Sequence, residues 1–107
     1  MNLRGRLRSW LPLTAVVVAG DSMLPTYRSG DWLLVRRTNR VAVGDVIVAP
    51  DPRDGRRLLV KRITHAAPGG WVIEGDHPDR STDSRAFGPI SRDAVIGSVL
   101  FRYHRGS

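Results

Sequence analysis

One serine in this sequence stands in a context that suits a nucleophile. Ser22 lies in "GDSMLPT", directly after an apolar run that ends at Gly20. Such a break can expose the hydroxyl, and glycine lets the backbone approach a substrate carbonyl while the Ser22 N–H stays free to donate to an oxyanion. Serine is also a favoured helix N-cap, and Pro25 can preset a short helical turn. A capping role for Ser22 therefore stands beside the catalytic one.

The only lysine is the second candidate. Lys61 is one of 17 basic residues, and the other sixteen are arginine. An ammonium group can lose its proton when it is desolvated, whereas a guanidinium stays charged. Period-2 alternation puts Leu59, Lys61 and Ile63 on one face of a strand, which predicts a buried amine with a lowered pKa that could act as a general base. The opposite alternation would expose Lys61 or pair it with a carboxylate.

The chain offers few other catalytic or metal-binding groups. Its three histidines, His65, His77 and His104, lie in no recognisable triad context, whereas serine with a lysine base is a known variant of the catalytic triad. The absence of cysteine excludes disulfides and thiolate metal sites, and the chain has no HExxH zinc-binding motif. We therefore expect no metal ion and no cofactor.

Length and charge describe one small basic domain. At 107 residues, 41% hydrophobic and 25% charged, the chain has the composition of a single globular domain. We expect a basic arm at residues 1–9 and one catalytic β domain at residues 10–107. The arm is expected to be disordered or to contact an anionic membrane through Arg4, Arg6 and Arg8. The net charge is +7, but the arginines are scattered, so we expect no specific nucleic-acid partner.

Short strands separated by turns must position these groups. The apolar run before Ser22 is too short for a membrane span, which needs ~20 residues, and its β-branched side chains favour a buried strand at 14–19. Helical periodicity is confined to about one turn at 23–27. We therefore expect an all-β, mainly antiparallel fold with at most a short helical turn after the nucleophile. Further strands are expected at 32–37, 41–50 with a bulge or bend at Gly44, 56–64, 71–76 and 94–104 with a break at Gly97.

Three segments resemble, in the same order, the sequence boxes of the type I signal peptidase family of Ser/Lys proteases. They are "GDSMLPT" at 20–26, "LLVKRI" at 58–63 and "EGDHPDRSTDSRAFGPI" at 74–90. With "GDWLLV" and "GDVIV" they cover nearly all of the chain from residue 16 onward. The resemblance implies a small signal-peptidase-like β domain that acts as a serine endopeptidase.

The resemblance also implies a role for each matching residue. Ser22 would be the acylating nucleophile and Lys61 its general base. Ser81 would orient the lysine, and Asp83 would support that region. Arg85 would pair with Asp83 or nearby carbonyls and hold the loop.

Substrate contacts and departures from the family pattern fall around the serine. A pocket near Met23 and Pro25 would favour a small residue before the cut. Gly20 stands where many bacterial members carry a hydroxyl that serves as a second oxyanion donor. His77 stands where the family usually has asparagine. We see neither the transmembrane helix that typically precedes the serine box nor the inserted second β domain of long members.

These features most resemble the subgroup of nickel-type superoxide dismutase maturation proteases. Such an enzyme would remove an N-terminal propeptide from a protein precursor, in the cytoplasm or peripheral to a membrane. A compact signal peptidase I that cleaves secretory leaders at the membrane is the alternative. A self-cleaving repressor would need a DNA-binding domain, and about twenty residues precede Ser22. A non-catalytic β module that binds acidic partners is a further class.

Overall fold

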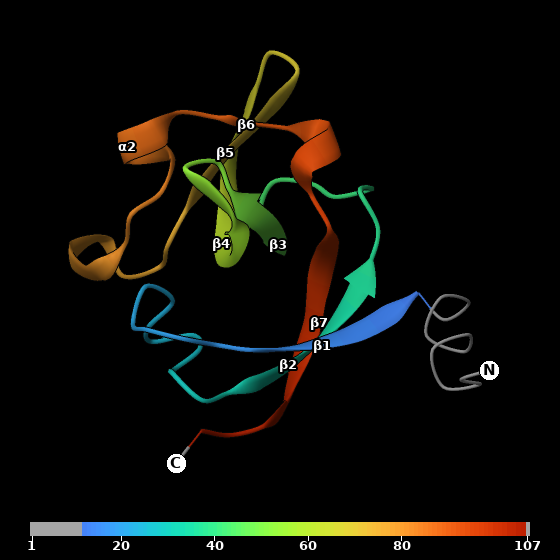
Figure 1. Ribbon diagram of the computed structural model, residues 1–107, viewed down its shortest axis with the longest axis vertical. Helices are drawn as coiled ribbons and strands as arrows, with labels where there is room; N and C mark the ends of the chain where they lie inside the picture. Colours follow the sequence, from blue (N-terminus) through green and yellow to red (C-terminus); the bar gives the residue numbers. More distant parts are fainter. Residues whose placement is uncertain (1–11, 107) are drawn as a thin grey trace.

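One antiparallel sheet is the framework of the described chain (Figure 1). The computed structural model describes residues 12–106, and within them seven strands pair in the order β1-β2-β7-β3-β4-β5-β6. Three short helical elements occupy the segment between β5 and β7. The elements are β1 Leu13–Val17, β2 Trp32–Arg37, β3 Val46–Asp51, β4 Asp54–Ala67, β5 Gly70–Glu74, η1 Pro78–Arg80, α2 Ser84–Phe87, β6 Ile90–Ser91, η2 Arg92–Ala94 and β7 Gly97–His104.

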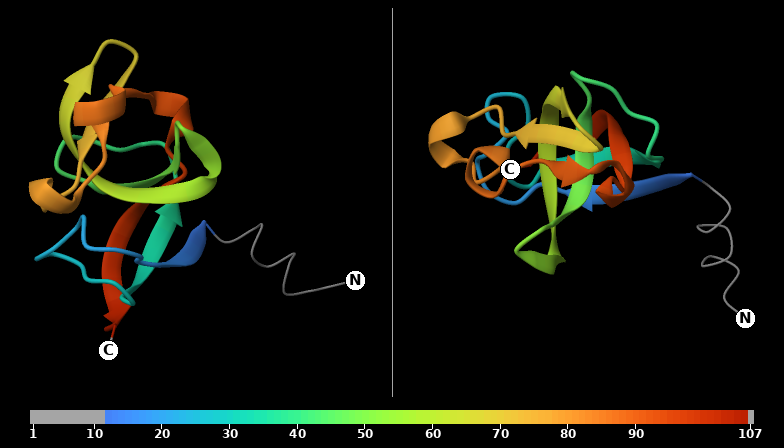
Figure 2. Two further views of the ribbon diagram at one scale, coloured as in Figure 1. Left: turned by 60° about the vertical axis from the view of Figure 1, so that its left-hand side comes forward. Right: turned by 90° about the horizontal axis from the view of Figure 1, so that it is seen from above.

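The expected all-β, mainly antiparallel fold is confirmed. In Figures 1 and 2, β1, β2 and β7 form one part of the domain, and β3, β4, β5 and β6 form the other. A tight hairpin joins β4 to β5, and Gly69 takes the positive φ of 69° that its turn requires. A second hairpin joins β3 to β4 through a turn after Asp51.

Alternating side chains from these strands build two apolar clusters. Ile47, Ile63 and Ile73 are fully buried and anchor the larger cluster, which lies between β3, β4 and β5. Leu33, Val35 and Val48 belong to the smaller cluster beside β2. β4 contributes Leu59 and Ile63 to the larger cluster. Because side chains alternate along a strand, Lys61 lies between them on the same face and is buried as well.

The strand predicted at 14–19 is present, but the prediction that it is buried is wrong. The strand exists as β1, but Val17 is 48% exposed, and Val18, which follows the strand, is the buried residue of this stretch. β1 lies at the end of the sheet order and pairs with β2 alone among the described strands. An edge strand with one packed face keeps half of its apolar side chains exposed, whatever their β propensity.

The expected single helical turn after Ser22 is present, with an i→i−4 bond of 2.9 Å from the Tyr27 N–H to the Met23 carbonyl, and it does not extend into a helix. Two further predicted features take a different form. Gly44, with φ of 100°, forms a turn before β3, so the bend lies outside the strand. β7 begins at Gly97, where a side chain would overlap the Arg36 carbonyl, so this glycine starts the strand and does not break it.

The predicted basic arm, with Arg4, Arg6 and Arg8, lies outside the described residues. Within residues 12–106, no helix has the length and apolar composition needed to cross a membrane.

The core on β4 can be tested by truncation. Replacing Ile63, which is 0% exposed, with alanine should lower the free energy of unfolding by about 2–5 kcal/mol, because the cavity cannot fully collapse. Leu100→Ala is the control, since Leu100 is 46% exposed and should cost less than about 1 kcal/mol. Urea unfolding at neutral pH measures both, and equal losses would contradict this packing.

Candidate active site

A groove of about 700 Å³ runs between two strand edges. One wall is formed by residues 15–23, from β1 and the segment after it, and the other by residues 57–61 of β4. β5 pairs with β4 only from Arg62 to Ala67, so the earlier part of β4 has no described strand partner on that side. Both walls therefore offer backbone donors and acceptors that another extended chain could use.

Ser22 lines this groove directly after β1 and is half-buried. Its carbonyl oxygen accepts a hydrogen bond of 2.8 Å from the His77 N–H, and no described residue is bonded to its own N–H or hydroxyl. Gly20, with φ of 84°, turns the chain just before it. A serine cap accepts a backbone N–H at its hydroxyl oxygen, and no described backbone N–H is bonded to Ser22 in this way, so the structure does not support the capping alternative.

Lys61 faces the same groove from β4 and is only 4% exposed. Its Nζ donates a 3.0 Å hydrogen bond to Ser81 Oγ. Burial lowers the pKa of this amine below its ordinary value, and although the Asp83 carboxylate opposes that change, the Arg85 and Arg53 guanidiniums reinforce it. The predicted placement of Lys61 between Leu59 and Ile63 on the buried face is confirmed.

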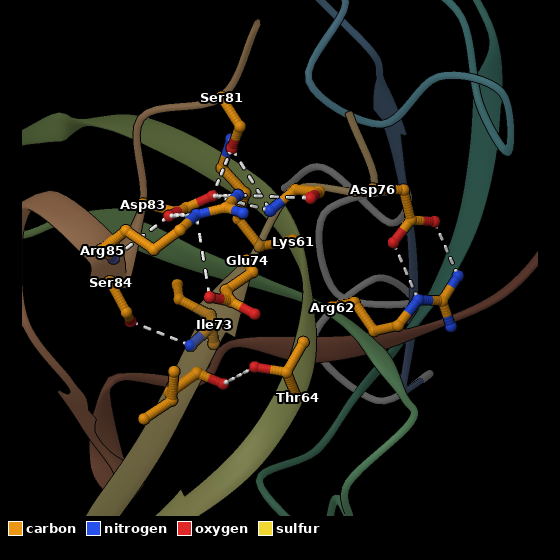
Figure 3. A network of polar contacts seen from close by, with 12 residues as sticks. Lys61, Arg62, Thr64, Ile73, Glu74, Asp76, Ser81, Asp83, Ser84 and Arg85 are labelled. Carbon is orange, nitrogen blue, oxygen red and sulfur yellow. Dashed lines mark hydrogen bonds and ion pairs between the residues drawn. The ribbon is translucent and has the colours of Figure 1, made fainter. Parts of the chain in front are cut away.

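A polar relay holds the Ser81 hydroxyl (Figure 3). Ser81 Oγ donates to Asp83 Oδ2 at 2.5 Å, and the Gly75 N–H donates to the same carboxylate oxygen at 2.8 Å. Arg85 clasps the Asp83 carboxylate with Nε at 2.9 Å and Nη2 at 2.6 Å. Since the Ser81 proton is directed at Asp83, the Ser81 oxygen is left to accept from Lys61.

Asp83 is buried yet stays ionised. Burial alone would raise the pKa of its carboxyl, but hydrogen bonds from Arg85, Ser81 and the Gly75 and Arg85 backbone N–H groups together lower it well below its usual range. This carboxylate also caps α2, because it accepts from the Arg85 N–H. One buried anion thus orients Ser81, pairs with Arg85 and begins a helix.

Gly75 brings the serine and the lysine relay together. A Cβ at this position would overlap both Ser81 Oγ and the Ser22 carbonyl oxygen, so only glycine fits between them. The Lys61 amine is bonded to Ser81 and not to the Ser22 hydroxyl. Ser22 and Lys61 therefore share one groove, with the relay beside them.

A second network ties the serine segment to β4, and sequence reasoning missed it. Thr26 Oγ1 donates to Asp76 Oδ2 at 2.6 Å. Arg62 Nε and Nη2 donate to the same carboxylate, each at 2.9 Å, as Figure 3 shows. Arg62 follows Lys61, and Thr26 lies four residues after Ser22. The network therefore fixes the segment of the proposed nucleophile relative to that of the proposed base.

The remaining predicted residues divide in two. Met23 is 1% exposed and lines the groove, whereas Pro25 is exposed and lies outside the lining. His77 contributes its backbone N–H to Ser22, and its buried Nδ1 has no described partner. Among residues 12–106, no cluster of three or more histidine or acidic side chains could hold a metal ion.

Two sequence comparisons relate this chain to known peptidases. The Peptidase S24-like family profile matches residues 8–100, and the chain belongs to this family. The chain is also 32% identical over 111 aligned positions to the mitochondrial inner membrane protease subunit 1 of Xenopus tropicalis. That match covers 81% of this chain and 66% of the relative, slightly less than two thirds of its length. Both comparisons support a protease.

The relay can be tested through Asp83. Asp83→Asn should lower the free energy of unfolding at neutral pH by about 2–3 kcal/mol, because it leaves Arg85 without its buried counter-charge, although Arg85 is partly exposed. The folded-state pKa of Asp83 is depressed, so its contribution is present above its unfolded pKa of ~3.9 and is lost as the pH falls toward the lower folded value.

The difference between wild type and Asp83→Asn should therefore shrink below about pH 4 in urea unfolding. The exposed Asp79, in the same loop, gives the control variant Asp79→Asn, which should stay within about 0.5 kcal/mol. A difference that persists undiminished at pH 2 would contradict the ionised relay.

Proposed function

We propose that this protein is a serine endopeptidase in which Ser22 is the nucleophile and Lys61 the general base. The observation that carries the proposal is the buried Lys61 amine, which lines a groove together with Ser22 and has a lowered pKa. A neutral amine has a lone pair that can take the serine proton, and the hydrogen bond to Ser81 fixes its direction.

The open edges of the groove favour an extended peptide as substrate. A strand inserted between residues 15–19 and 57–61 would pair its backbone with both walls, so that affinity comes from the main chain and specificity from alternate side chains. Met23 and Val48 contribute apolar surface to the groove, which suits a small apolar residue beside the scissile bond.

The chemistry then follows from the residues present. Ser22 Oγ attacks the scissile carbonyl while its proton moves to Lys61 Nζ, and the unengaged Ser22 N–H donates to the oxyanion. The Lys61 ammonium next protonates the leaving amine. Water, deprotonated by the same amine, hydrolyses the acyl ester and regenerates Ser22.

Variants at the two groups test this mechanism. Ser22→Ala, Lys61→Arg and Lys61→Met should each lower kcat/KM for a cleaved peptide by roughly 10³-fold or more, because each removes the nucleophile or the base. In wild type, activity should fall as the pH drops through the lowered pKa of Lys61, since the protonated amine is no longer a base.

Lys61→Met also separates catalysis from stability. Burying the amine favours its neutral form, so folding costs free energy below the ordinary lysine pKa of ~10.4. The methionine variant should be at least as stable as wild type in urea, and it should still be inactive. Substantial activity in any of the three variants would refute the Ser/Lys assignment.

We further propose that the substrate is a protein precursor with an N-terminal propeptide, specifically that of a nickel-type superoxide dismutase. The support is the sequence resemblance to that maturation subgroup, in a chain of 107 residues without cysteine. Cleavage in the cytoplasm, or at a membrane surface that the basic arm contacts, is part of this proposal.

A leader-cleaving peptidase at a membrane is the second candidate, and one surface favours it. Val17 pairs with Trp32 across β1 and β2, and the Trp32 ring packs edge-on against Tyr103 at 6.2 Å between centroids. All three side chains are exposed, as is Phe101 on β7. Amphipathic aromatic rings are typical of surfaces that contact lipid headgroups. The name of the Xenopus relative, an inner membrane protease subunit, agrees with this candidate.

Two substrates distinguish these candidates. Incubation with a nickel superoxide dismutase precursor should yield one shortened chain, whose new N-terminus mass spectrometry identifies, and Ser22→Ala should yield none. A secretory precursor supplied with anionic vesicles should stay uncut. If only the secretory precursor is processed, and only with vesicles, the membrane candidate replaces the maturation one.

A further inference from the structure

The groove carries an excess of positive charge. Besides Lys61, its lining includes Arg53, Arg57 and Arg80, whereas Asp21 is its only carboxylate among the described residues. Arg53, Arg57 and Lys61 belong to the hairpin that β3 and β4 form. The tip of this hairpin projects from the body of the domain in the right-hand view of Figure 2.

Most of these arginines already have an anionic partner. Arg53 Nε and Nη2 donate to the two oxygens of the buried Asp51 carboxylate at 3.0 and 2.8 Å. Arg80 lies 3.7 Å from Asp21 in an exposed pair. At the hairpin tip, Arg56 is paired with Asp54 at 3.1 Å and does not line the groove.

Arg57 is the cation that these pairs leave over. It is exposed and lines the groove, and its guanidinium makes no hydrogen bond or ion pair with a described residue. Its field reaches the Asp51 and Asp54 carboxyls, whose pKa values it helps to lower after their closer partners. Each of those carboxylates is bound by another arginine, so the guanidinium of Arg57 keeps its donors for a ligand.

The spacing defines where such a ligand would carry its charge. Arg57 precedes Lys61 by four residues on β4, which is ~13 Å along a strand. A substrate strand has nearly the same rise, so a side chain about four residues from the scissile bond would lie beside Arg57. Aspartate or glutamate at that position of the substrate could form an ion pair with the Arg57 guanidinium.

We propose that Arg57 is a specificity-determining residue that selects substrates with an acidic side chain about four residues from the cut bond. This inference rests on the proposed endopeptidase function. Because the guanidinium is exposed, the preference is modest, about 3- to 10-fold in kcat/KM for an acidic over a basic peptide at low salt. It weakens as salt shortens the screening length.

Matched peptides test the proposal. Alanine-rich extended peptides with one small-residue cleavage site carry Glu, Gln or Lys at the fourth position on either side of it. Wild type should prefer the Glu peptide over the Lys peptide on one side, and Arg57→Glu should reverse that order. Arg56→Glu makes the same charge change on the neighbouring, paired arginine outside the groove and should keep the wild-type order.

Binding separates this inference from the proposed function. Fluorescence anisotropy with the same peptides and the Ser22→Ala variant should show tighter binding of the Glu peptide than of the Lys peptide. The double variant that carries both Ser22→Ala and Arg57→Glu should lose this preference. If the Gln peptide is cut in a Ser22-dependent manner but Arg57→Glu leaves the Glu-to-Lys ratio unchanged, this inference fails and the endopeptidase stands. If the ratio in binding depends on Arg57 but no peptide is cut, the endopeptidase proposal fails and the acidic preference stands. An equal response to Arg56→Glu would also overturn the role of Arg57.

Discussion

The site depends on a primary amine held out of water beside a buried anion. Lys61 sits between two core side chains of β4, and that position makes its charged form costly. A direct contact with the Asp83 carboxylate would stabilise the Lys61 ammonium. Instead, the Ser81 hydroxyl lies between the two groups, and Arg85 pairs with the carboxylate. The relay therefore keeps the direction of the amine fixed while offsetting much of the attraction that would hold its proton.

The same constraint explains why so many polar groups gather around a small apolar core. Asp83 must be ionised to hold Ser81, so it needs several donors, and Gly75 supplies one of them while leaving room for Ser22. The Thr26 and Arg62 bonds to Asp76 join the segment after Ser22 to β4. Together these contacts preorganise two short segments that come from distant parts of the chain.

Local pattern predicted the strands and the buried lysine, but not their places in the sheet. β2 has the expected bounds, 32–37, and alternation correctly put Lys61 on the buried face because the side chains at 59 and 63 belong to the core. The exposure of β1 follows from its position at the sheet edge, which pairings far along the chain decide. The contact between Thr26 and Asp76 spans fifty positions, and no local signal specifies it. Likewise, three arginines lie in one hairpin and look alike in the sequence. Only the structure shows that Arg53 and Arg56 are each paired with a carboxylate, whereas the guanidinium of Arg57 is not.

The most direct measurement of the central claim is the ionisation of Lys61 itself. Because the chain has a single lysine, selective ¹³C labelling of lysine gives one side-chain signal, and its chemical shift can be followed by NMR as the pH is varied. A midpoint clearly below ~10.4, the ordinary lysine value, is the result expected for a desolvated base. A midpoint at or above that value would show an ammonium ion stabilised by its surroundings, and Lys61 could not then serve as the base.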